Sequence, residues 1–384
     1  HHNRTIEVHV FDFKQSIYGQ EVQLELVERI RDDQAFQDLD ALRQQLQKDQ
    51  EAAQAVLARH GWSKDSVQTQ RKHPEAAIVI LNYNGRSHLE RFLPSVLASG
   101  YPNMRVVAAD NGSPDDSIAF LEKRYPEVEH LDLGRNFGFA EGYNQALKTI
   151  PSPYLVLLNS DVEVTPGWLD PIIELMEHDR SIAAVQPKIL SLNDKSRFEY
   201  AGACGGWLDA LGYPFCRGRI FAETELDEGQ YDTVEDIFWA SGAAFVIRKS
   251  LYEQLGGFDG SFFAHSEEID LCWRLKKAGY RIVVQPRSVV YHLGGGTLAY
   301  NTPRKTYLNF RNSLYTILKN ERAARLWWLF PLRLVLDGLA GLLFLSQGKW
   351  RHILSIIQAH FAVYIRWGRL MHRRAQAQKR IERS

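Results

Sequence analysis

Three carboxylates lie within four consecutive positions of the segment FFAHSEEIDLCWR, residues 262–274: Glu267, Glu268 and Asp270. The cluster is costly, because like charges repel one another and lose hydration beside the aromatic and apolar residues around them. One interpretation is structural, since acidic side chains in the first turn of a helix meet the positive end of its dipole. The other is catalytic, because burial and repulsion raise the pKa of a carboxylate until it can accept a proton near neutral pH.

A regular alternation of apolar runs and helical patterns precedes this cluster. Apolar runs cover residues 76–81, 104–110, 128–133 and 154–161, and helical patterns start near Ser87, Pro114, Gly138 and Pro166. Strands and helices in this rhythm predict a parallel sheet that is covered by helices on both faces. In such sheets ligands bind beyond the carboxyl ends of the strands, so polar residues at those ends are candidate ligand contacts.

Each predicted strand ends in polar side chains. They are Asn82 and Asn84, Asp110 and Asn111, Arg135 and Asn136, and Asn159 and Asp161. One such residue alone is explained by turn formation, because Asn and Asp side chains bond to their own backbone. Four strands that each deliver a polar group to the same edge of a sheet predict a binding site there.

The residue types at this edge favour a hard divalent cation. Carboxylate oxygens are typical ligands of Mg²⁺ and Mn²⁺, which complete their shells with water and with substrate phosphates. Asp161 is the expected main ligand. His292, which follows another apolar strand in the segment VVYHLGGGT, is the expected second ligand, and a structural histidine is the alternative.

The composition and the absence of two common motifs limit which ligands the chain is expected to bind and how it binds them. Lys plus Arg and Asp plus Glu number 46 each, so no overall positive field attracts nucleic acid. The chain has neither a GxxxxGK[ST] phosphate loop nor a GxGxxG dinucleotide turn, so a bound nucleotide is expected to depend on the metal. Three widely spaced cysteines indicate no disulfide framework and favour the cytoplasm.

Seven sequence blocks between residues 77 and 320 resemble one known family. In chain order they are IVILNYNG, VVAADNGSPDDS, GRNFGFAEGYNQAL, LLNSDVEV, WASGAAFVIRKS, LGGFDGSFFAHSEEIDLCWR and VVYHLGGG. This content and order resemble the family 2 glycosyltransferases of the GT-A fold, close to the rhamnosyltransferase-like branch. The resemblance implies an α/β fold with a doubly wound, mostly parallel sheet, and transfer of a sugar from a nucleotide-sugar to a hydroxyl acceptor.

The resemblance also implies which residues hold the donor, a dTDP-, UDP- or GDP-linked sugar. Asp110 would contact the nucleoside, the motif NSD at 159–161 would bind ribose and Mg²⁺ or Mn²⁺, and His292 would join the metal shell. This motif departs from the usual DxD, which leaves Asp161 as the main charged ligand. The other expected nucleotide-sugar contacts are Asn82, Asn84, Arg135, Asn136 and Asn159, with Arg135 stabilising the charge that develops on the diphosphate.

On the acceptor side, the helix-start pair would supply the catalytic base of an inverting transfer. The usual Glu-Asp pair reads Glu267-Glu268 here, and we expect Glu268 to be the base and Glu267 to orient the acceptor. Asp270 is expected either beside the acceptor or in a structural role, as a helix cap or as the partner of an arginine. Trp239 is expected to shape the acceptor slot, with packing in the core as the alternative.

Residues 1–60 have a different pattern and precede a polar linker at 61–75. An alternating strand, a YG turn and a helix from about Leu39 to His60 resemble the C-terminal end of bacterial riboflavin kinase over residues 3–57. In that family the glutamate of the strand, here Glu7, is the base. The family's metal and nucleotide loop has no counterpart in this segment, so we expect the segment to be inactive.

Residues 321–384, which follow the predicted glycosyltransferase domain at 76–320, form a helical region rich in apolar and basic residues. The run RLWWLFPLRLVLDGLAGLLFL is nearly long enough to cross a bilayer, but Arg333 and Asp337 interrupt it and are expected to pair. The favoured interpretation is peripheral contact of a helical pair with the membrane. A soluble or dimerising hairpin and a true membrane span are the alternatives.

These observations lead to one main hypothesis about function. The chain is expected to be a metal-dependent inverting glycosyltransferase that builds cell-surface polysaccharide or glycolipid on a glycan or lipid-linked acceptor. It would act in the cytoplasm, at the inner face of the cell membrane. The alternatives are a noncatalytic module that binds nucleotide-sugars or glycans, and a remnant of a riboflavin kinase fusion.

Overall fold

A computed structural model describes residues 27–32, 36, 38–60, 73–200, 203–220, 223–294 and 302–382. The chain divides into two compact units, residues 1–72 and 73–384. In the first unit helix α1 spans Leu39–Arg59, with Asp38 accepting a hydrogen bond from the backbone N–H of Ala41, which confirms the predicted helix. The predicted strand of this unit, Glu7 and most of the linker lie outside the described residues.

The second unit begins with four parallel strands that alternate with helices. They are β1 (Ala76–Asn82), α3 (Arg86–Leu97), β2 (Met104–Asp110), α4 (Ser117–Arg124), β3 (Glu129–Asp132), α5 (Gly138–Leu147) and β4 (Tyr154–Asn159), as the sequence predicted. Asn82 pairs with Asp110, and Asp110 pairs with Asp132, across neighbouring strands. Leu81 pairs with Asn159, so the ends of β1, β2, β3 and β4 lie at nearly the same level of the sheet.

The remaining elements extend the main sheet beyond β4 and add two separate two-stranded sheets, one of residues 206–208 and 214–216 and one of residues 219–220 and 223–224. These elements are β5 (Val162–Val164), α6 (Asp170–His178), β6 (Ile182–Ser191), β7 (Gly206–Leu208), β8 (Pro214–Cys216), β9 (Arg219–Ile220), β10 (Glu223–Thr224), β11 (Glu235–Asp236), β12 (Ala244–Arg248), α7 (Lys249–Gln254), α8 (Glu267–Lys277) and β13 (Arg281–His292). The order is β11-β13-β6-β12-β4-β1-β2-β3, with β5 on β13. Strand β12 runs antiparallel to β4 and β6, and the sheet is otherwise mostly parallel.

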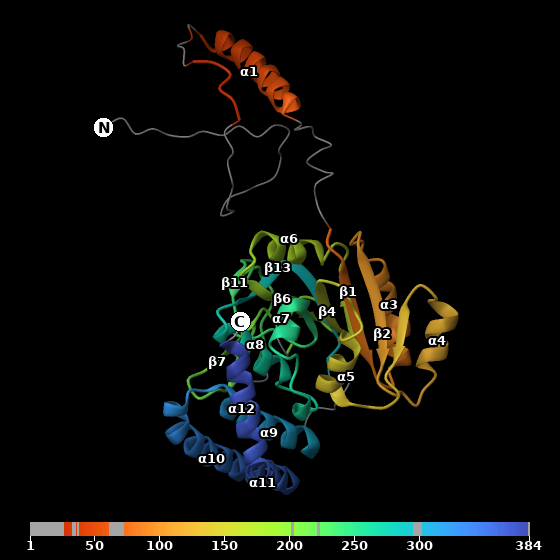
Figure 1. The fold of residues 1–384 in the computed structure, drawn as a ribbon, viewed down its shortest axis with the longest axis vertical. Helices are drawn as coiled ribbons and strands as arrows, with labels where there is room; N and C mark the ends of the chain where they lie inside the picture. Colours follow the sequence, from red (N-terminus) through yellow and green to blue (C-terminus); the bar gives the residue numbers. More distant parts are fainter. Residues whose placement is uncertain are drawn as a thin grey trace. The chain divides into compact units, whose positions relative to one another are not determined.

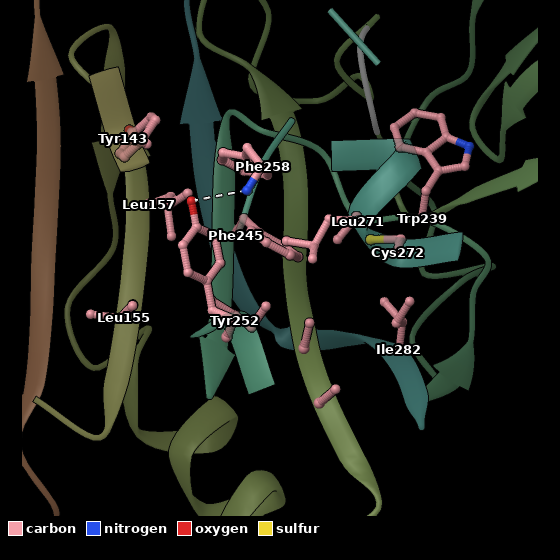
Figure 2. Packing of buried hydrophobic residues seen from close by; sticks show 14 of the residues in the cluster. Tyr143, Leu155, Leu157, Trp239, Phe245, Tyr252, Phe258, Leu271, Cys272 and Ile282 are labelled. Atoms are coloured by element: carbon pink, nitrogen blue, oxygen red, sulfur yellow. Dashed lines mark hydrogen bonds between the residues drawn. The ribbon is translucent and has the colours of Figure 1, made fainter. Parts of the chain in front are cut away.

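Helices cover both faces of the sheet because side chains alternate along each strand. On β1, Ala77 and Val79 face a core cluster that includes α5, α7 and α8, whereas Ile78 and Ile80 face α3 and α6. Figure 2 shows the first cluster, where Tyr252 and Phe258 pack beside strands β4 and β12. This two-sided burial explains why the strands read as continuous apolar runs.

Four helices complete the unit. They are α9 (Pro303–Asn320), α10 (Ala323–Ser346), α11 (Trp350–Ile365) and α12 (Trp367–Ile381). Helices α10 and α11 lie side by side at one end of the unit, and α12 returns from that end toward α8 (Figure 1). Leu314 and Leu318 of α9, Val363 of α11 and Leu370 of α12 form a core with Phe262, so these helices pack directly on the segment before α8.

Helix α10 is long and apolar enough to cross a membrane by length and composition, although less than a quarter of its most apolar stretch is buried. Its two interior charges do not pair with each other, which corrects our expectation. Arg333 donates to the Leu211 carbonyl and to Ser313 Oγ, both at 2.8 Å, while Asp337 lies 3.0 Å from His360 of α11. Both charges are buried, and each fastens α10 to a different neighbour.

A buried ionic cluster joins α8 to α9. The Asp270 carboxylate, which is fully buried, accepts from Arg274 (2.8 and 3.0 Å), from Lys319 Nζ (2.8 Å) and from the Asn320 amide (2.8 Å). Although burial opposes ionisation, the charges of Arg274 and Lys319 lower the pKa of Asp270 to about 2. Asp270 therefore holds two buried cations in place.

We predict that Asp270→Asn destabilises the protein by about 3–5 kcal/mol, because it leaves buried positive charge without its counter-ion. Urea unfolding followed by circular dichroism measures this difference. Glu90→Gln, which removes the exposed partner of Arg86, is the control, and its effect should stay below about 1 kcal/mol. An unchanged unfolding midpoint in Asp270→Asn would show that the cluster does not stabilise the fold.

Candidate active site

The carboxyl ends of β1 and β2 meet in a cluster of hydrogen-bonded side chains. The Asn82 amide donates to Asp110 Oδ1 (2.9 Å) and to Ser113 Oγ (3.1 Å). Asp110 accepts from the Ser113 hydroxyl (2.5 Å) and from its backbone N–H (2.8 Å), and both Asn82 and Asp110 are almost fully buried. The structure thus brings these two predicted residues together and adds Ser113, which the sequence reasoning had not singled out.

Two of the asparagines at the strand ends stabilise loops. Asn111 accepts from the Phe137 N–H (2.9 Å) and donates to the Gly138 carbonyl (3.0 Å), and Asn136 Oδ1 accepts from the Gly138 N–H (2.8 Å). Gly138 has φ of +78°, and a Cβ there would lie 2.6 Å from the Phe263 ring. The turn-forming alternative therefore accounts for Asn111 and for the amide oxygen of Asn136.

The other predicted donor contacts are more open. Asn84 is exposed, with φ of +53°, and its backbone N–H donates to Ser113 Oγ (2.9 Å). Arg135 is also exposed, and its guanidinium carbon lies 4.5 Å from the centroid of the Phe137 ring. Asn159 is half-buried at the end of β4. Among the predicted donor contacts, Asn84, Arg135 and Asn136 are exposed, and the amide oxygen of Asn136 is already bonded within its loop.

Asp161, His292 and Glu199 form a buried row. His292 Nε2 lies 3.2 Å from Asp161 Oδ1, and its Nδ1 lies 3.4 Å from Glu199 Oε1. Burial opposes the charged ring, but the hydrogen bonds to Asp161 and Glu199 raise the pKa of His292 to about 10. The structure therefore brings the two predicted metal ligands together and places a second carboxylate behind the histidine.

This row suits a divalent cation site in which the protein supplies only some of the ligands. Asp161 and His292 offer two adjacent ligand atoms, and Glu199 faces the other ring nitrogen, as carboxylates do behind many metal-binding histidines. Within the described ranges no group of three or more His, Cys, Asp and Glu side chains is arranged to enclose a metal by itself. Two protein ligands suit a cation that takes its remaining ligands from water and substrate phosphates.

The turn before α8 has an unusual backbone. Phe263, His265 and Ser266 have φ of +66°, +73° and +70°, which is the left-handed region that residues with a Cβ rarely adopt. Such conformations cost about 1–3 kcal/mol each and persist only where surrounding contacts determine them. We call residues 261–268 the catalytic turn, because it presents Glu267 and Glu268, the pair that the sequence predicts to supply the base.

Contacts from two helices hold the catalytic turn. Asn312 of α9, which is fully buried, donates to the carbonyls of residues 262, 264 and 265 at 2.7–3.1 Å. Arg311 donates to the carbonyls of residues 261 and 262 at 3.1 and 2.7 Å. On the other side, the N–H groups of Phe139 and Ala140 at the start of α5 donate to the Phe263 carbonyl. These bonds compensate for the strained backbone.

Glu267 and Glu268 lie in an environment that favours their neutral forms. Burial, followed by the charge of Glu268, raises the pKa of Glu267 well above its ordinary value. Burial also raises the pKa of Glu268 to about 7, and one oxygen of each carboxyl group is buried with no hydrogen-bond partner in the described chain. Glu268 is the more exposed of the two, so it is better placed to meet an acceptor.

The catalytic turn and the buried row of Asp161, His292 and Glu199 act electrostatically on the same neighbouring groups. The carboxyl groups of Asp161 and Glu267 both add to the effect of burial in raising the pKa of Tyr143, whose hydroxyl donates to the Leu158 carbonyl near the end of β4. Lys305 of α9 acts electrostatically on both His265 and Glu199. The predicted convergence of strand-end carboxylates and the Glu267-Glu268 pair on one region is consistent with these couplings.

The structure corrects two predictions on the acceptor side. Asp270 is 0% exposed and holds Arg274 and Lys319, so it does not meet an acceptor, and the arginine-pairing alternative is confirmed. Trp239 packs in the core over Gly206, and its indole N–H donates to the Trp207 carbonyl (2.9 Å), so the packing alternative describes it (Figure 2). Both predictions rested on closeness in the sequence to other site residues, and closeness in the sequence does not reveal which way a side chain points.

Several residues of this region carried no signal that the sequence reasoning recognised. Glu199 belongs to none of the sequence blocks that carry the resemblance to the family. Arg311 and Asn312 look like ordinary positions on an amphipathic helix, since only the folded chain shows the carbonyl groups that they bind. Ser113 does carry a signal, because it belongs to the block VVAADNGSPDDS and lies three positions after Asp110.

Comparisons with known proteins agree with this geometry. The family model for glycosyl transferase family 2 matches residues 77–256, and the model for riboflavin kinase matches residues 1–57. An N-acetylglucosaminyl-diphospho-decaprenol L-rhamnosyltransferase of Mycobacterium tuberculosis is 28% identical over 276 residues, which cover 68% of this chain and 89% of the relative. A pre-mycofactocin glycosyltransferase of the same species is 30% identical over 57% of this chain and 43% of its own length.

A comparison of structures gives the same fold. The crystal structure of GalNAc-T7 with UDP, GalNAc and Mn²⁺ superposes with a TM-score of 0.50 at 17% identity, covering 65% of this chain and 48% of that one. At this identity the likeness concerns the fold alone, which is the GT-A fold. The family match and the named relatives identify residues 77–256 as a domain of glycosyl transferase family 2, and the likeness in fold agrees with them.

Proposed function

We propose that the chain is a metal-dependent, inverting glycosyltransferase that transfers a sugar from a nucleotide-sugar to a glycan or lipid-linked acceptor in cell-surface glycan assembly. The supporting observation is the strained catalytic turn, which presents Glu268 with a pKa of about 7, next to Glu267, which acts on Tyr143 together with Asp161. The mycobacterial relative is named for L-rhamnosyl transfer to a diphospho-decaprenol lipid, which suggests the class of acceptor. The nucleotide of the donor is dTDP, UDP or GDP.

In this proposal Asp161 and His292 would hold Mg²⁺ or Mn²⁺, and Glu199 would keep the imidazole oriented. The cation supplies charge that balances the negative charge of a nucleoside diphosphate leaving group. Arg135, which is exposed at the strand ends, adds a positive side chain to the same region. Asp110 and Asn82, which are hydrogen-bonded to each other, would contact the nucleoside.

Glu268 is the proposed general base. An acceptor hydroxyl gives its proton to the Glu268 carboxylate as its oxygen attacks the anomeric carbon, and the bond from that carbon to the diphosphate breaks. The neighbouring Glu267, whose pKa lies well above its ordinary value because it is buried, keeps its proton and can donate a hydrogen bond. One neutral and one ionised carboxyl group in adjacent environments make this division of roles possible.

Two alternatives are less well supported. A noncatalytic binding module would not need two buried carboxyl oxygens without hydrogen-bond partners, because leaving polar atoms unsatisfied costs free energy. The riboflavin kinase match covers residues 1–57, and the site described above is formed by residues of the second unit, 73–384.

The end of the second unit formed by α10 and α11 is suited to contact with the cytoplasmic membrane surface. Exposed apolar side chains repeat every three or four positions along both helices. On α10 they are Trp328, Leu332, Val335, Leu339 and Leu342, and on α11 they are Trp350, Leu354, Ile357, Phe361 and Tyr364. Such stripes on neighbouring helices, with arginines and lysines at their ends, are typical of helices that lie in a membrane interface.

We predict that Glu268→Gln lowers kcat by a factor of about 10²–10⁴, the usual contribution of a general base, while nucleotide binding is retained. Release of UDP, GDP or dTDP from the corresponding sugar nucleotides measures the rate. Glu228→Gln, at an exposed loop position, is the control and should behave as wild type. Full activity in Glu268→Gln would exclude Glu268 as the base.

The pH dependence provides a second test of Glu268. A base must be ionised to act, so kcat/KM should rise with pH below the pKa of Glu268, about 7, and level off above it. The residual rate of Glu268→Gln should lack this rise. A wild-type profile that is flat between pH 5 and 8 would contradict the assignment, because this range brackets the expected pKa.

We predict that a chelator abolishes binding of the nucleoside diphosphate, and that Glu199→Gln weakens Mn²⁺ binding by about 10–100-fold, the usual effect of losing a carboxylate behind a metal-binding histidine. Asp161→Ala should weaken it at least as much. Electron paramagnetic resonance of free Mn²⁺ measures the affinity without any turnover. Asp40→Ala in α1 is the control, and equal Mn²⁺ affinity in all variants would rule out this metal site.

We predict that the protein floats with vesicles of phosphatidylethanolamine and phosphatidylglycerol. The double variant Leu339→Ser and Phe361→Ser should bind at least about tenfold more weakly, because burial of each side chain contributes about 1.5–3 kcal/mol. Ile220→Ser with Val234→Ser removes two exposed apolar residues elsewhere and is the matched control. Equal flotation of both double variants would show that the α10–α11 surface is not the contact.

A further inference from the structure

A cavity of about 430 Å³ lies beside the catalytic turn and is lined by elements of the turn, α5, α9 and the corner between α11 and α12. Its lining includes Phe263 of the turn, Glu141 of α5, Arg311 of α9, and Arg366, Arg369 and Arg373 at the corner and on α12. Four arginines thus face one carboxylate around a single cavity. Such an excess of one sign around a concave surface attracts ligands of the opposite sign.

The partners of these side chains show which charges remain available. Arg373 pairs with Asp259, and Glu141 accepts from Asn144 (3.1 Å) and from Gln145. Arg366, which is exposed, approaches the Tyr315 hydroxyl at 3.4 Å. Arg369 is exposed and forms no hydrogen bond or ion pair with any described residue.

Arg311 contributes in a different way, since it is only 6% exposed and its Nε and Nη2 bind Asn312 and the carbonyls of the catalytic turn. No described carboxylate pairs with it. A buried guanidinium without a carboxylate partner keeps a positive charge at the floor of the cavity. Guanidinium groups match phosphate oxygens with paired N–H donors, so the cavity has the chemistry of a phosphate or diphosphate site.

The position of the cavity indicates what carries the phosphates. Phe263 belongs both to its lining and to the turn that presents Glu268. At the other side, Arg366 directly follows Tyr364 and Ile365, which are 51% and 81% exposed at the end of the apolar α11 surface. The positive cavity therefore lies between a proton acceptor and a surface suited to lipid.

We propose that this cavity binds the diphosphate group of a lipid-linked acceptor, with the acceptor sugar directed toward Glu268 and the lipid chain along the end of α11. This inference rests on the proposed function and deepens it, since it selects a diphospho-lipid from the acceptor classes. Arg366 and Arg369 are the proposed phosphate contacts. Arg311 ties the same site to the catalytic turn.

The test measures binding of farnesyl diphosphate in detergent micelles by isothermal titration calorimetry, with chelator present to keep the diphosphate out of the cation-dependent donor site. The double variant R366A/R369A should lose affinity by roughly 100-fold, the effect of two charge-assisted hydrogen bonds. K349A/R351A removes two positive charges at the opposite end of α11 and should bind as wild type. Arg369→Glu, a single exposed substitution, should also weaken binding.

Competition identifies the source of the phosphate groups. Inorganic pyrophosphate should displace farnesyl diphosphate, whereas phosphatidylglycerol in the micelles should not. Displacement by phosphatidylglycerol as readily as by pyrophosphate, or equal losses in both double variants, would overturn the proposal in favour of general attraction to anionic lipid. Unchanged affinity in R366A/R369A would overturn it as well.

A separate measurement distinguishes this proposal from the proposed function. Mn²⁺-dependent binding of UDP, GDP or dTDP reports on the donor site, and R366A/R369A should retain it. If that binding is intact and farnesyl diphosphate binding is indifferent to the arginines, only the acceptor site is wrong. If no nucleoside diphosphate binds with Mn²⁺, the proposed function itself fails.

Discussion

The hydrogen bonds from α9 to the catalytic turn are the constraint on which the rest of the site depends. Asn312 and Arg311 bind carbonyl groups of residues 261, 262, 264 and 265, and these bonds hold a backbone that would otherwise relax out of the left-handed region. The turn fixes where the Glu267-Glu268 pair begins. Without α9, the turn would keep the bonds from Phe139 and Ala140 to the Phe263 carbonyl but lose those to its other carbonyl groups.

This arrangement couples stability to function. The same helix that holds the catalytic turn is itself fastened to α8 by the buried Asp270 cluster, and it packs against α11 and α12 through Leu314 and Leu318. The C-terminal helices are therefore part of the unit that carries the site, although the family match ends at residue 256. A membrane contact on α10 and α11 would lie two helices away from the proposed base.

Burial disfavours the ionised form of every carboxyl group in this segment, but Asp270 and the Glu267-Glu268 pair respond to it in opposite ways. Asp270 is surrounded by cations, which keep it ionised and make it structural. Glu267 and Glu268, only three and two positions earlier, have no such partner, so burial raises their pKa values toward the range where a proton can be exchanged. Residues of similar chemistry in one short segment thus serve different purposes because their neighbours differ.

The sequence by itself determined the order of strands and helices up to β4, the polar residues at the strand ends and the family, because apolar periodicity and local motifs are properties of neighbouring residues. It could not assign Trp239 or Asp270, whose roles depend on which way a side chain points. Only the tertiary structure showed Glu199 behind His292, Arg333 separated from Asp337, and the arginines around the cavity at residue 263. Those contacts join residues far apart in the chain, and no local pattern records them.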